Sequence, residues 1–227
     1  MSNILIAIGG GEIKSKETLK IDEFIANEAK SKAATLGRRA IGLFVGTASH
    51  DSMPYFNSFR KTYTSVYDIK AEVALSVYGE MSVDKISEKI NMADFMYVGG
   101  GDTLFLLNHW KSTGIDKMLL DAYAQGKIIT GLSAGAVCWF DKAYSDYDIK
   151  PGEVGEYKIL QGLGLIKGVM CPHYNERPEF DEVAKNYPLC YAAENNAAII
   201  FEDGKAVKSL SSGGKAYVFE NGVRREL

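Results

Sequence analysis

The amino-acid sequence predicts a single α/β domain built on a mostly parallel sheet with helices on both faces. Two observations carry this prediction. Short apolar runs rich in β-branched residues end in glycine or another small residue, and amphipathic stretches of helical spacing follow them. Continuous apolar strands that alternate with helices are typical of parallel sheets covered on both sides. The length of 227 residues suits one such unit, so we expect residues 1–227 to form one domain.

The alternation of strand and helix can be followed along the chain. The first strand, 4–8, runs into three glycines, and the segment 17–37 has apolar residues at helical spacing and ends at a glycine, a common helix C-cap. Further strands are expected at 39–45, 71–75, 95–98 and 127–131, and helices at 55–62, 83–91, 104–120 and 134–140.

The C-terminal part has a different pattern. Short strand-like runs alternate with tight turns such as Glu202-Asp203-Gly204 and Glu220-Asn221-Gly222. We therefore expect antiparallel strands that finish the domain, at 189–193, 197–202, 206–210 and 216–220. The polar stretch 141–161 is the one long segment expected to be irregular, and loops of that length in compact domains are often functional.

Composition and charge restrict the function classes. The formal net charge of −3 gives no strong attraction to nucleic acid or to anionic lipid, and no apolar run is long enough to span a bilayer. The N-terminus lacks the features of a signal peptide, and Cys138, Cys171 and Cys190 show no pairing or metal-binding spacing. We expect a cytoplasmic protein with buried, reduced thiols, without cofactor or metal, and a homodimer is compatible with the sequence.

A serine motif follows the predicted strand 127–131. The sequence GLSAG at 131–135 stands between a strand and a helix, which is the context of a nucleophile elbow. The turn is so tight that residues two before and two after the serine cannot carry bulk. Ser133 then projects from the carboxyl edge of the sheet, and the N–H of Ala134 lies at a helix N-terminus that favours an oxyanion. A serine that only caps the helix is the alternative.

A glycine-rich loop, GGGDT at 99–103, also follows a strand and opens a helix. Neighbouring parallel strands would place it beside the serine, where Gly100 or Gly101 can supply a second oxyanion donor. The structural alternative is a tight turn in which Asp102 caps the helix. The earlier sequence GGGE at 9–12 is a weaker signal of the same kind, with a structural role as one wall of the pocket.

A serine nucleophile needs a base, and the sequence contains three histidines. His109 falls inside a predicted helix, and His50 lies in a loop at the carboxyl end of a strand, where it could line the pocket. His173 follows a strand-like run and is preceded by Pro172, which stiffens the approach to the imidazole. We therefore expect His173 to be the base.

The imidazole needs an acid that fixes its tautomer. Glu194 interrupts two apolar runs, and a carboxylate at such a place is usually paired or functional. Asp148, in the polar segment after the serine, is the rival. Glu176 and Glu179 follow the histidine closely, but the local chain can point them elsewhere. We prefer Glu194.

Four segments together resemble peptidase E and its relatives, the aspartyl dipeptidase and cyanophycinase group of serine peptidases. They are GGGDT, GLSAGA, CPHYN and AENNAA. The resemblance implies a fold similar to the class I glutamine amidotransferases, with a flavodoxin-like sheet. It also implies a Ser133 nucleophile, a His173 base, an acid at Glu194 or Asp148, and an oxyanion hole formed by Gly100 or Gly101 with Ala134.

The sequence departs from related families at two places. Amidotransferases carry cysteine at the position of Ser133 and an H-x-E pair, whereas here Glu176 follows His173 by one residue more. Glutamine-dependent ammonia release is therefore not expected. The segment 143–148 does not closely match the aspartyl dipeptidases, so the resemblance does not extend to a preference for N-terminal aspartate.

These observations predict a serine-type peptidase that hydrolyses small peptides through a Ser-His-acid triad and an acyl-enzyme. We expect the segment 141–161 to wall the site, Arg177 and Tyr174 to contact substrate, and carboxylates of the wall to meet an ammonium group. Those carboxylates are Asp146, Asp148, Glu153 and Glu156. Three alternatives stay open: an esterase of the α/β-hydrolase type, with Asp148 as its acid; a non-catalytic small-molecule binding module; and transfer of the acyl group to an amine.

Overall fold

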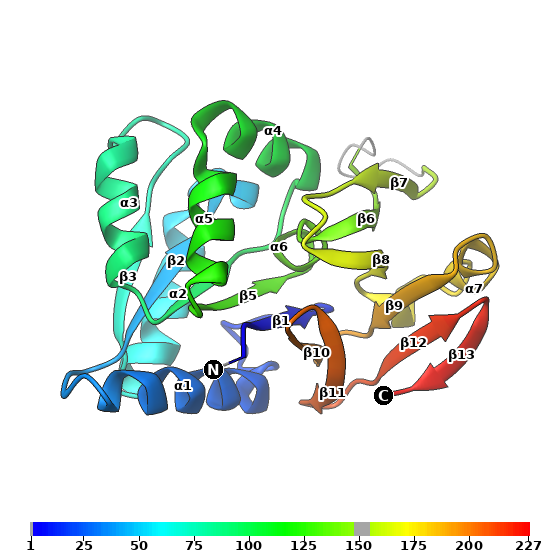
Figure 1. Ribbon diagram of the computed structural model, residues 1–227, viewed down its shortest axis with the longest axis horizontal. Coiled ribbons are helices and arrows are strands. Elements are labelled where there is room, and N and C mark those ends of the chain that lie inside the picture. The colour runs from blue at the N-terminus through cyan, green and yellow to red at the C-terminus, as the bar shows by residue number, and fades with distance from the viewer. Residues whose placement is uncertain (1, 148–154) are drawn as a thin grey trace.

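The computed structural model describes residues 2–147 and 155–227 and is built on two sheets (Figure 1). The strands of the first sheet are β1 (Ile4–Ile8), β2 (Ile41–Val45), β3 (Lys70–Ala74), β4 (Phe95–Val98), β5 (Ile128–Leu132), β10 (Ala197–Glu202) and β11 (Lys205–Ser211). Their order is β11-β10-β1-β5-β4-β2-β3. The five strands from β1 to β3 are parallel, and β10 and β11 extend the sheet in antiparallel fashion. The predicted α/β class is confirmed.

Helices cover both faces of this sheet (Figure 1). One face carries α1 (Leu19–Ala34) and α2 (Met53–Ser65), and the other carries α3 (Val83–Met92), α4 (Thr103–Thr113) and α5 (Ile115–Ala124). The alternation of side chains along β1 explains this arrangement. Leu5 and Ala7 pack in the core under α3, α4 and α5, while Ile6 and Ile8 pack in the core under α1 and α2. Both faces of β1 are therefore buried.

A second sheet lies beside the first and was not expected from the sequence (Figure 1). Its strands are β6 (Phe140–Ser145), β7 (Lys158–Gln161), β8 (Ile166–Cys171), β9 (Leu189–Ala193), β12 (Ala216–Glu220) and β13 (Val223–Glu226), in the order β13-β12-β9-β8-β6-β7. β9, expected among the antiparallel strands, pairs in parallel with β8 and antiparallel only with β12.

Two predictions around the serine helix were wrong. Helix α6 spans only Ala134–Val137, and the chain then enters β6, so the ends of the segment 141–161 are strands rather than irregular structure. Ala143 and Tyr144 are buried within this polar stretch, and the backbone groups of β6 pair with β8 and β7. Those partners are separate strands later in the chain, so local hydrophobic periodicity did not reveal them.

The remaining short helices are η1 (Thr47–Ser49), η2 (Tyr174–Glu176) and α7 (Phe180–Ala184). None of the helices within 2–147 and 155–227 is long and apolar enough to cross a membrane. Cys138, Cys171 and Cys190 are free and buried, as expected for small core residues. The carboxyl ends of β1, β4 and β5 meet at one edge of the first sheet, where open parallel sheets bind ligands.

Candidate active site

The turn between β5 and α6 holds Ser133 in a strained backbone conformation, with φ 53° and ψ −114°. The flanking glycines are steric requirements of this turn. A Cβ on Gly131 would collide with the carbonyl of Gly135, and a Cβ on Gly135 would collide with the carbonyl of Val98 on β4. The predicted nucleophile elbow is therefore present, and the serine side chain is partly exposed at the sheet edge.

The end of β1 sets the spacing between the serine and the histidine. Ser133 N–H donates to the Ile8 carbonyl at 3.0 Å, and His173 N–H donates to the next carbonyl, that of Gly9, at 2.9 Å. His173 stands before η2 with a left-handed backbone, φ 49°. This geometry brings Nε2 of His173 to 2.8 Å from Oγ of Ser133.

The other ring nitrogen of His173 faces Asn195. Nδ1 of His173 lies 2.5 Å from Oδ1 of Asn195, and Nδ2 of Asn195 donates to Oε1 of Glu176 at 2.5 Å. An ionised carboxylate only accepts hydrogen bonds, so Glu176 fixes which end of the Asn195 amide faces the histidine. The amide oxygen then requires Nδ1 to carry the proton, which leaves the lone pair of Nε2 directed at the serine hydroxyl.

The structure does not bring Glu194 to the histidine. Its carboxylate accepts hydrogen bonds from Lys215 N at 2.9 Å and from the Tyr217 hydroxyl at 3.3 Å. Asp148, the rival acid, lies outside the described residues. Sequence reasoning missed Asn195 because it looked for a carboxylate, although the side chain next to Glu194 was the polar group facing the site.

Burial lowers the pKa of His173 below its ordinary value of 6.5. The hydrogen bond with Asn195 opposes this shift, whereas the nearby positive charge of Arg177 adds to it. A lowered pKa keeps the imidazole neutral near pH 7, which is the state that a general base requires.

A cavity of about 430 Å³ opens in front of Ser133 and His173, and Gly100 and Gly101 form part of its lining. The Gly100 N–H donates a long hydrogen bond, 3.4 Å, to the hydroxyl of Tyr55, whose pKa burial raises to about 12. In the described part of the chain, the N–H groups of Gly101 and Ala134 have no hydrogen-bond partner. These two amides are free to donate to an oxyanion. Asp102 caps α4 by accepting from Phe105 N at 2.8 Å, which is the role that the structural alternative gave it.

The loop after β1 forms one wall of the same cavity, through Gly11, Glu12 and Lys14. Gly10 pairs with Asn195 as an isolated parallel bridge. A side chain at Gly10 would collide with the Asn195 amide oxygen and with the His173 ring, so only glycine leaves room for their contact. The loop therefore forms one wall of the pocket, as expected from the sequence, and its Gly10 also leaves room for the contact between Asn195 and His173.

Two residues expected to contact substrate do not line this cavity. The Arg177 guanidinium is buried, lies 4.1 Å from the centre of the Tyr157 ring and donates to the Tyr144 carbonyl at 3.2 Å. Tyr174 is also buried, and its hydroxyl bonds to Asp181 and accepts from Arg224. Their polar groups are engaged within the protein, which leaves the charges of the cavity wall to Glu12 and Lys14.

The other two histidines are not part of the described cavity. The rings of His50 and Phe105 lie 4.2 Å apart, and those of Phe105 and His109 lie 5.8 Å apart. His109 is held in α4, as expected, and His50 does not line the pocket as its loop position had allowed. His173 is therefore the histidine beside the serine.

The sequence model of Peptidase family S51 matches residues 5–209, nearly the whole chain. The chain belongs to peptidase family S51. It is a serine peptidase of the peptidase E type, in agreement with the four sequence segments that suggested this family. The uncharacterized peptidase YgaJ of Bacillus subtilis is 33% identical to this S51 peptidase over 225 residues, with 96% of this chain and 91% of YgaJ covered. The uncharacterized peptidase Lmo0363 of Listeria monocytogenes is 35% identical over 133 residues, which cover 56% of this chain and 64% of Lmo0363.

Solved structures have the same fold as this S51 peptidase. A peptidase E candidate from Listeria monocytogenes EGD-e superposes with a TM-score of 0.68 at 27% identity, covering 93% of this chain and all of the other. A peptidase from an acI-B1 Actinobacterium superposes with a TM-score of 0.66 at 18% identity, covering all of this chain and 94% of the other, and this second likeness concerns the fold alone.

Proposed function

We propose that this serine peptidase hydrolyses short peptides through an acyl-enzyme on Ser133. The observation that carries the proposal is the unbroken series of contacts from Ser133 Oγ through the His173 ring to Asn195 and Glu176. Nucleophile, base and orienting group within hydrogen-bond reach are the arrangement that nucleophilic catalysis requires.

The proposed reaction has two halves. His173 Nε2 takes the hydroxyl proton as Ser133 Oγ attacks the peptide carbonyl carbon, and the amides of Gly101 and Ala134 donate to the oxyanion. The protonated imidazole then gives its proton to the leaving amine, the C–N bond breaks, and the acyl-enzyme remains. A water molecule, deprotonated by His173, hydrolyses the ester and restores Ser133. Throughout, Asn195 accepts from Nδ1–H and holds the ring in place.

The cavity supports a small substrate. Its volume of about 430 Å³ lies in the range of small-molecule sites, and Glu12 and Lys14 place one charge of each sign on its wall. A free dipeptide or short peptide offers the complementary pair, an ammonium group and a carboxylate.

A dipeptide library, screened with wild type and with Ser133→Ala side by side, tests this function. We expect hydrolysis of free dipeptides by wild type and a loss of about 10³-fold or more in the variant, as for triad members generally. N-acetylated dipeptides and casein should be poor substrates. Equal cleavage of casein or of the acetylated forms would favour an endopeptidase or esterase, and activity of the variant within tenfold of wild type would exclude the serine mechanism.

A further inference from the structure

A groove leads from the cavity at Ser133 along the exposed side of α2. It consists of two hollows, of about 430 and 650 Å³, and we call it the α2 groove. Neighbouring hollows share lining residues, which makes the path continuous: Lys14, Pro54 and Ser58 where the groove leaves the catalytic cavity, and Asn57, Lys61 and Ser65 between the two hollows.

The length of the groove matches an extended peptide. Pro54, Ser58, Lys61 and Ser65 are spaced by three or four residues, so they lie on one side of α2. From 54 to 65 the helix rises about 16 Å at 1.5 Å per residue. A fully extended chain covers that distance with about five residues. The groove is therefore longer than a dipeptide needs.

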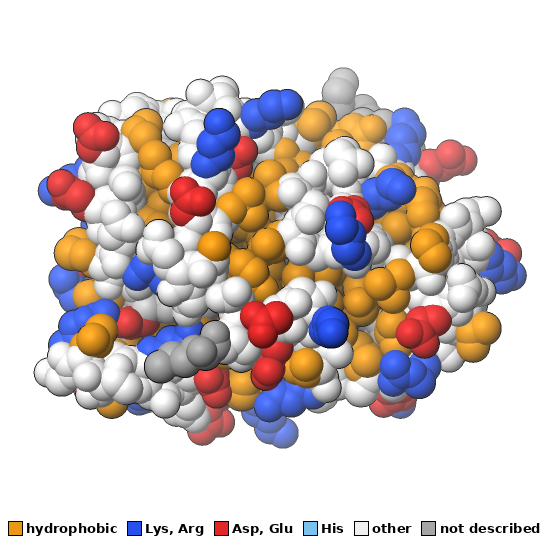
Figure 2. Space-filling view, viewed as in Figure 1, with side chains coloured by type: hydrophobic (Ala, Val, Ile, Leu, Met, Phe, Trp, Pro, Cys, Tyr) orange, Lys and Arg blue, Asp and Glu red, His pale blue; other side chains and the backbone are white. Residues whose placement is uncertain are grey.

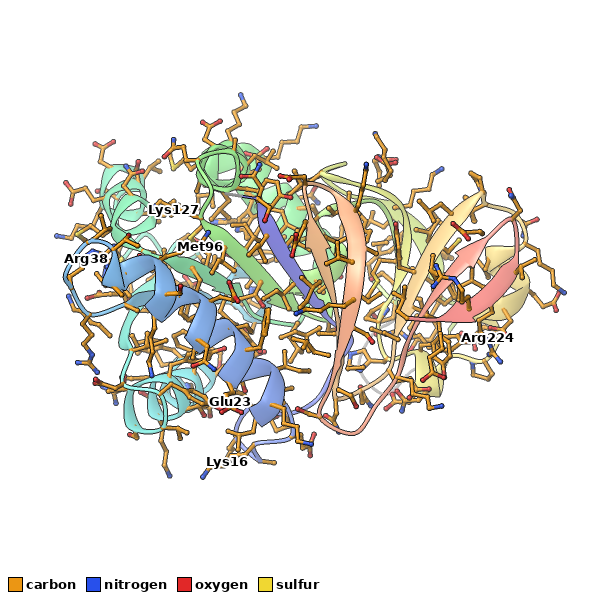
Figure 3. All side chains as sticks on the ribbon, turned by 60° about the horizontal axis from the view of Figure 1, so that its bottom comes forward. Lys16, Glu23, Arg38, Met96, Lys127 and Arg224 are labelled. Carbon is orange, nitrogen blue, oxygen red and sulfur yellow. The ribbon has the colours of Figure 1, made fainter. Side chains whose placement is uncertain are left out.

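The lining of the α2 groove is positively charged. It contains lysines and arginines and no aspartate or glutamate, and the whole of α2 has no acidic residue. Two cations at the outer end, Arg39 and Lys70, form ion pairs with Asp68 and Glu72. Within the described ranges, the other cations of the lining have no ion pair: Lys14, Lys16, Arg60 and Lys61. Figure 3 labels Lys16 at the edge of the molecule, next to the start of α1.

The nearby acidic groups do not line the groove. Glu12, on the wall of the catalytic cavity, is tied back to its own loop by accepting a hydrogen bond from Lys14 N. Asp22 is buried under α2, where burial raises its pKa to about 6 and Thr18 and Tyr63 donate to it. The protein as a whole has a net charge of −3, and Figure 2 shows charges of both signs scattered over one face of the molecule. The concentration of positive charge in the α2 groove is thus a local feature of the surface.

We propose that the α2 groove binds the carboxylate-bearing part of an acidic peptide whose scissile bond lies at Ser133. The proposal rests on the proposed function in taking a peptide as the ligand, and it adds the substrate class and a length of several residues. Lysine ammonium groups on flexible stems suit carboxylates of varied spacing. The groove opens into the catalytic cavity, and the negative net charge opposes long polyanions, so the geometry favours a peptide over nucleic acid.

Binding to the full-length Ser133→Ala protein tests the proposal without turnover. The probes are a fluorescein-labelled hexapeptide rich in glutamate, its glutamine counterpart, and a single-stranded hexathymidylate, measured by fluorescence anisotropy at two salt concentrations. We expect the acidic peptide to bind at least tenfold more tightly than the glutamine peptide, with affinity falling as salt rises. Lys61→Glu should weaken it about fivefold, and Lys14→Glu with Lys61→Glu about twentyfold.

Lys205→Glu is the matched control, because Lys205 is an exposed lysine at the start of β11, outside the groove. It should leave the affinity unchanged, and thermal melts check that all variants fold. Equal affinity for the two peptides overturns the proposal, and so does a loss of affinity in the Lys205 variant as large as that in the groove variants. Binding of the oligonucleotide as tight as that of the acidic peptide indicates a general polyanion site and also overturns the proposal. Wild type that binds the acidic peptide but cuts no peptide contradicts the proposed function alone.

Discussion

Replacing Asn195 with alanine leaves the Nδ1–H of His173 without its acceptor. The imidazole becomes positively charged during the reaction, and a hydrogen bond to a charged group contributes about 1.5–3 kcal/mol. Since about 1.4 kcal/mol corresponds to a factor of ten in rate, kcat/KM should fall about 10- to 150-fold, mostly through kcat. The assay is steady-state hydrolysis of the best dipeptide from the library, with thermal unfolding measured in parallel.

The neighbouring variant Glu194→Ala is the matched control. It removes the hydrogen bonds from Lys215 N and the Tyr217 hydroxyl, which connect the loop after β9 with β12 and with the residue before that strand. Two such bonds contribute about 1–3 kcal/mol to the free energy of unfolding, so this variant should be less stable but retain kcat/KM within about threefold. Loss of activity in Glu194→Ala together with full activity in Asn195→Ala would refute the assignment of the orienting group.

Further predictions concern the base and the wall of the site. Because burial lowers the pKa of His173, kcat/KM should fall on the acid side only as the pH drops through a value below 6.5. Asn195→Asp places a carboxylate at Nδ1, so it should raise the pH at which this fall occurs. A flat profile from pH 5 to 8 would count against His173. Gly10→Ala should lower kcat about 10- to 100-fold with little change in Tm, since the added Cβ meets the side chains of Asn195 and His173, which can move. Gly9→Ala should instead lower Tm, because its Cβ meets the backbone of β9. Equal effects of the two variants on Tm and on rate would contradict this difference. EDTA should leave the activity unchanged, because the histidines are dispersed in the sequence. Loss of activity in EDTA that zinc restores would contradict this prediction.

The sequence was informative where one segment carries the chemistry by itself. The elbow at Ser133 and the glycine loop at 99–103 are local motifs whose steric demands can be stated without a structure, and His173 followed by elimination among three histidines. Asn195 could not be chosen in this way. Its role depends on Glu176, nineteen residues earlier, and on Gly10, which belongs to the opposite end of the chain. Which of two adjacent side chains faces the histidine is set by the turn between β9 and β10.

The first sheet was predictable because its parallel strands β1, β2, β4 and β5 are apolar runs buried on both faces. The second sheet was not, because β6 and β7 are short, lie at the two ends of a polar segment, and pair with each other and, for β6, with β8. The same limit applies to Arg177. Its sequence position beside the base suggested a substrate contact, but stacking on Tyr157 takes up its guanidinium within the fold.

Labelling by an organophosphonate probe, with the modified residue mapped by mass spectrometry, tests the central claim most directly. The probe reacts with an activated serine, so wild type should carry one adduct, on Ser133, and the labelling rate should fall at least 100-fold in His173→Ala. Absence of an adduct on Ser133, or an unchanged rate in His173→Ala, would contradict a serine nucleophile activated by this histidine.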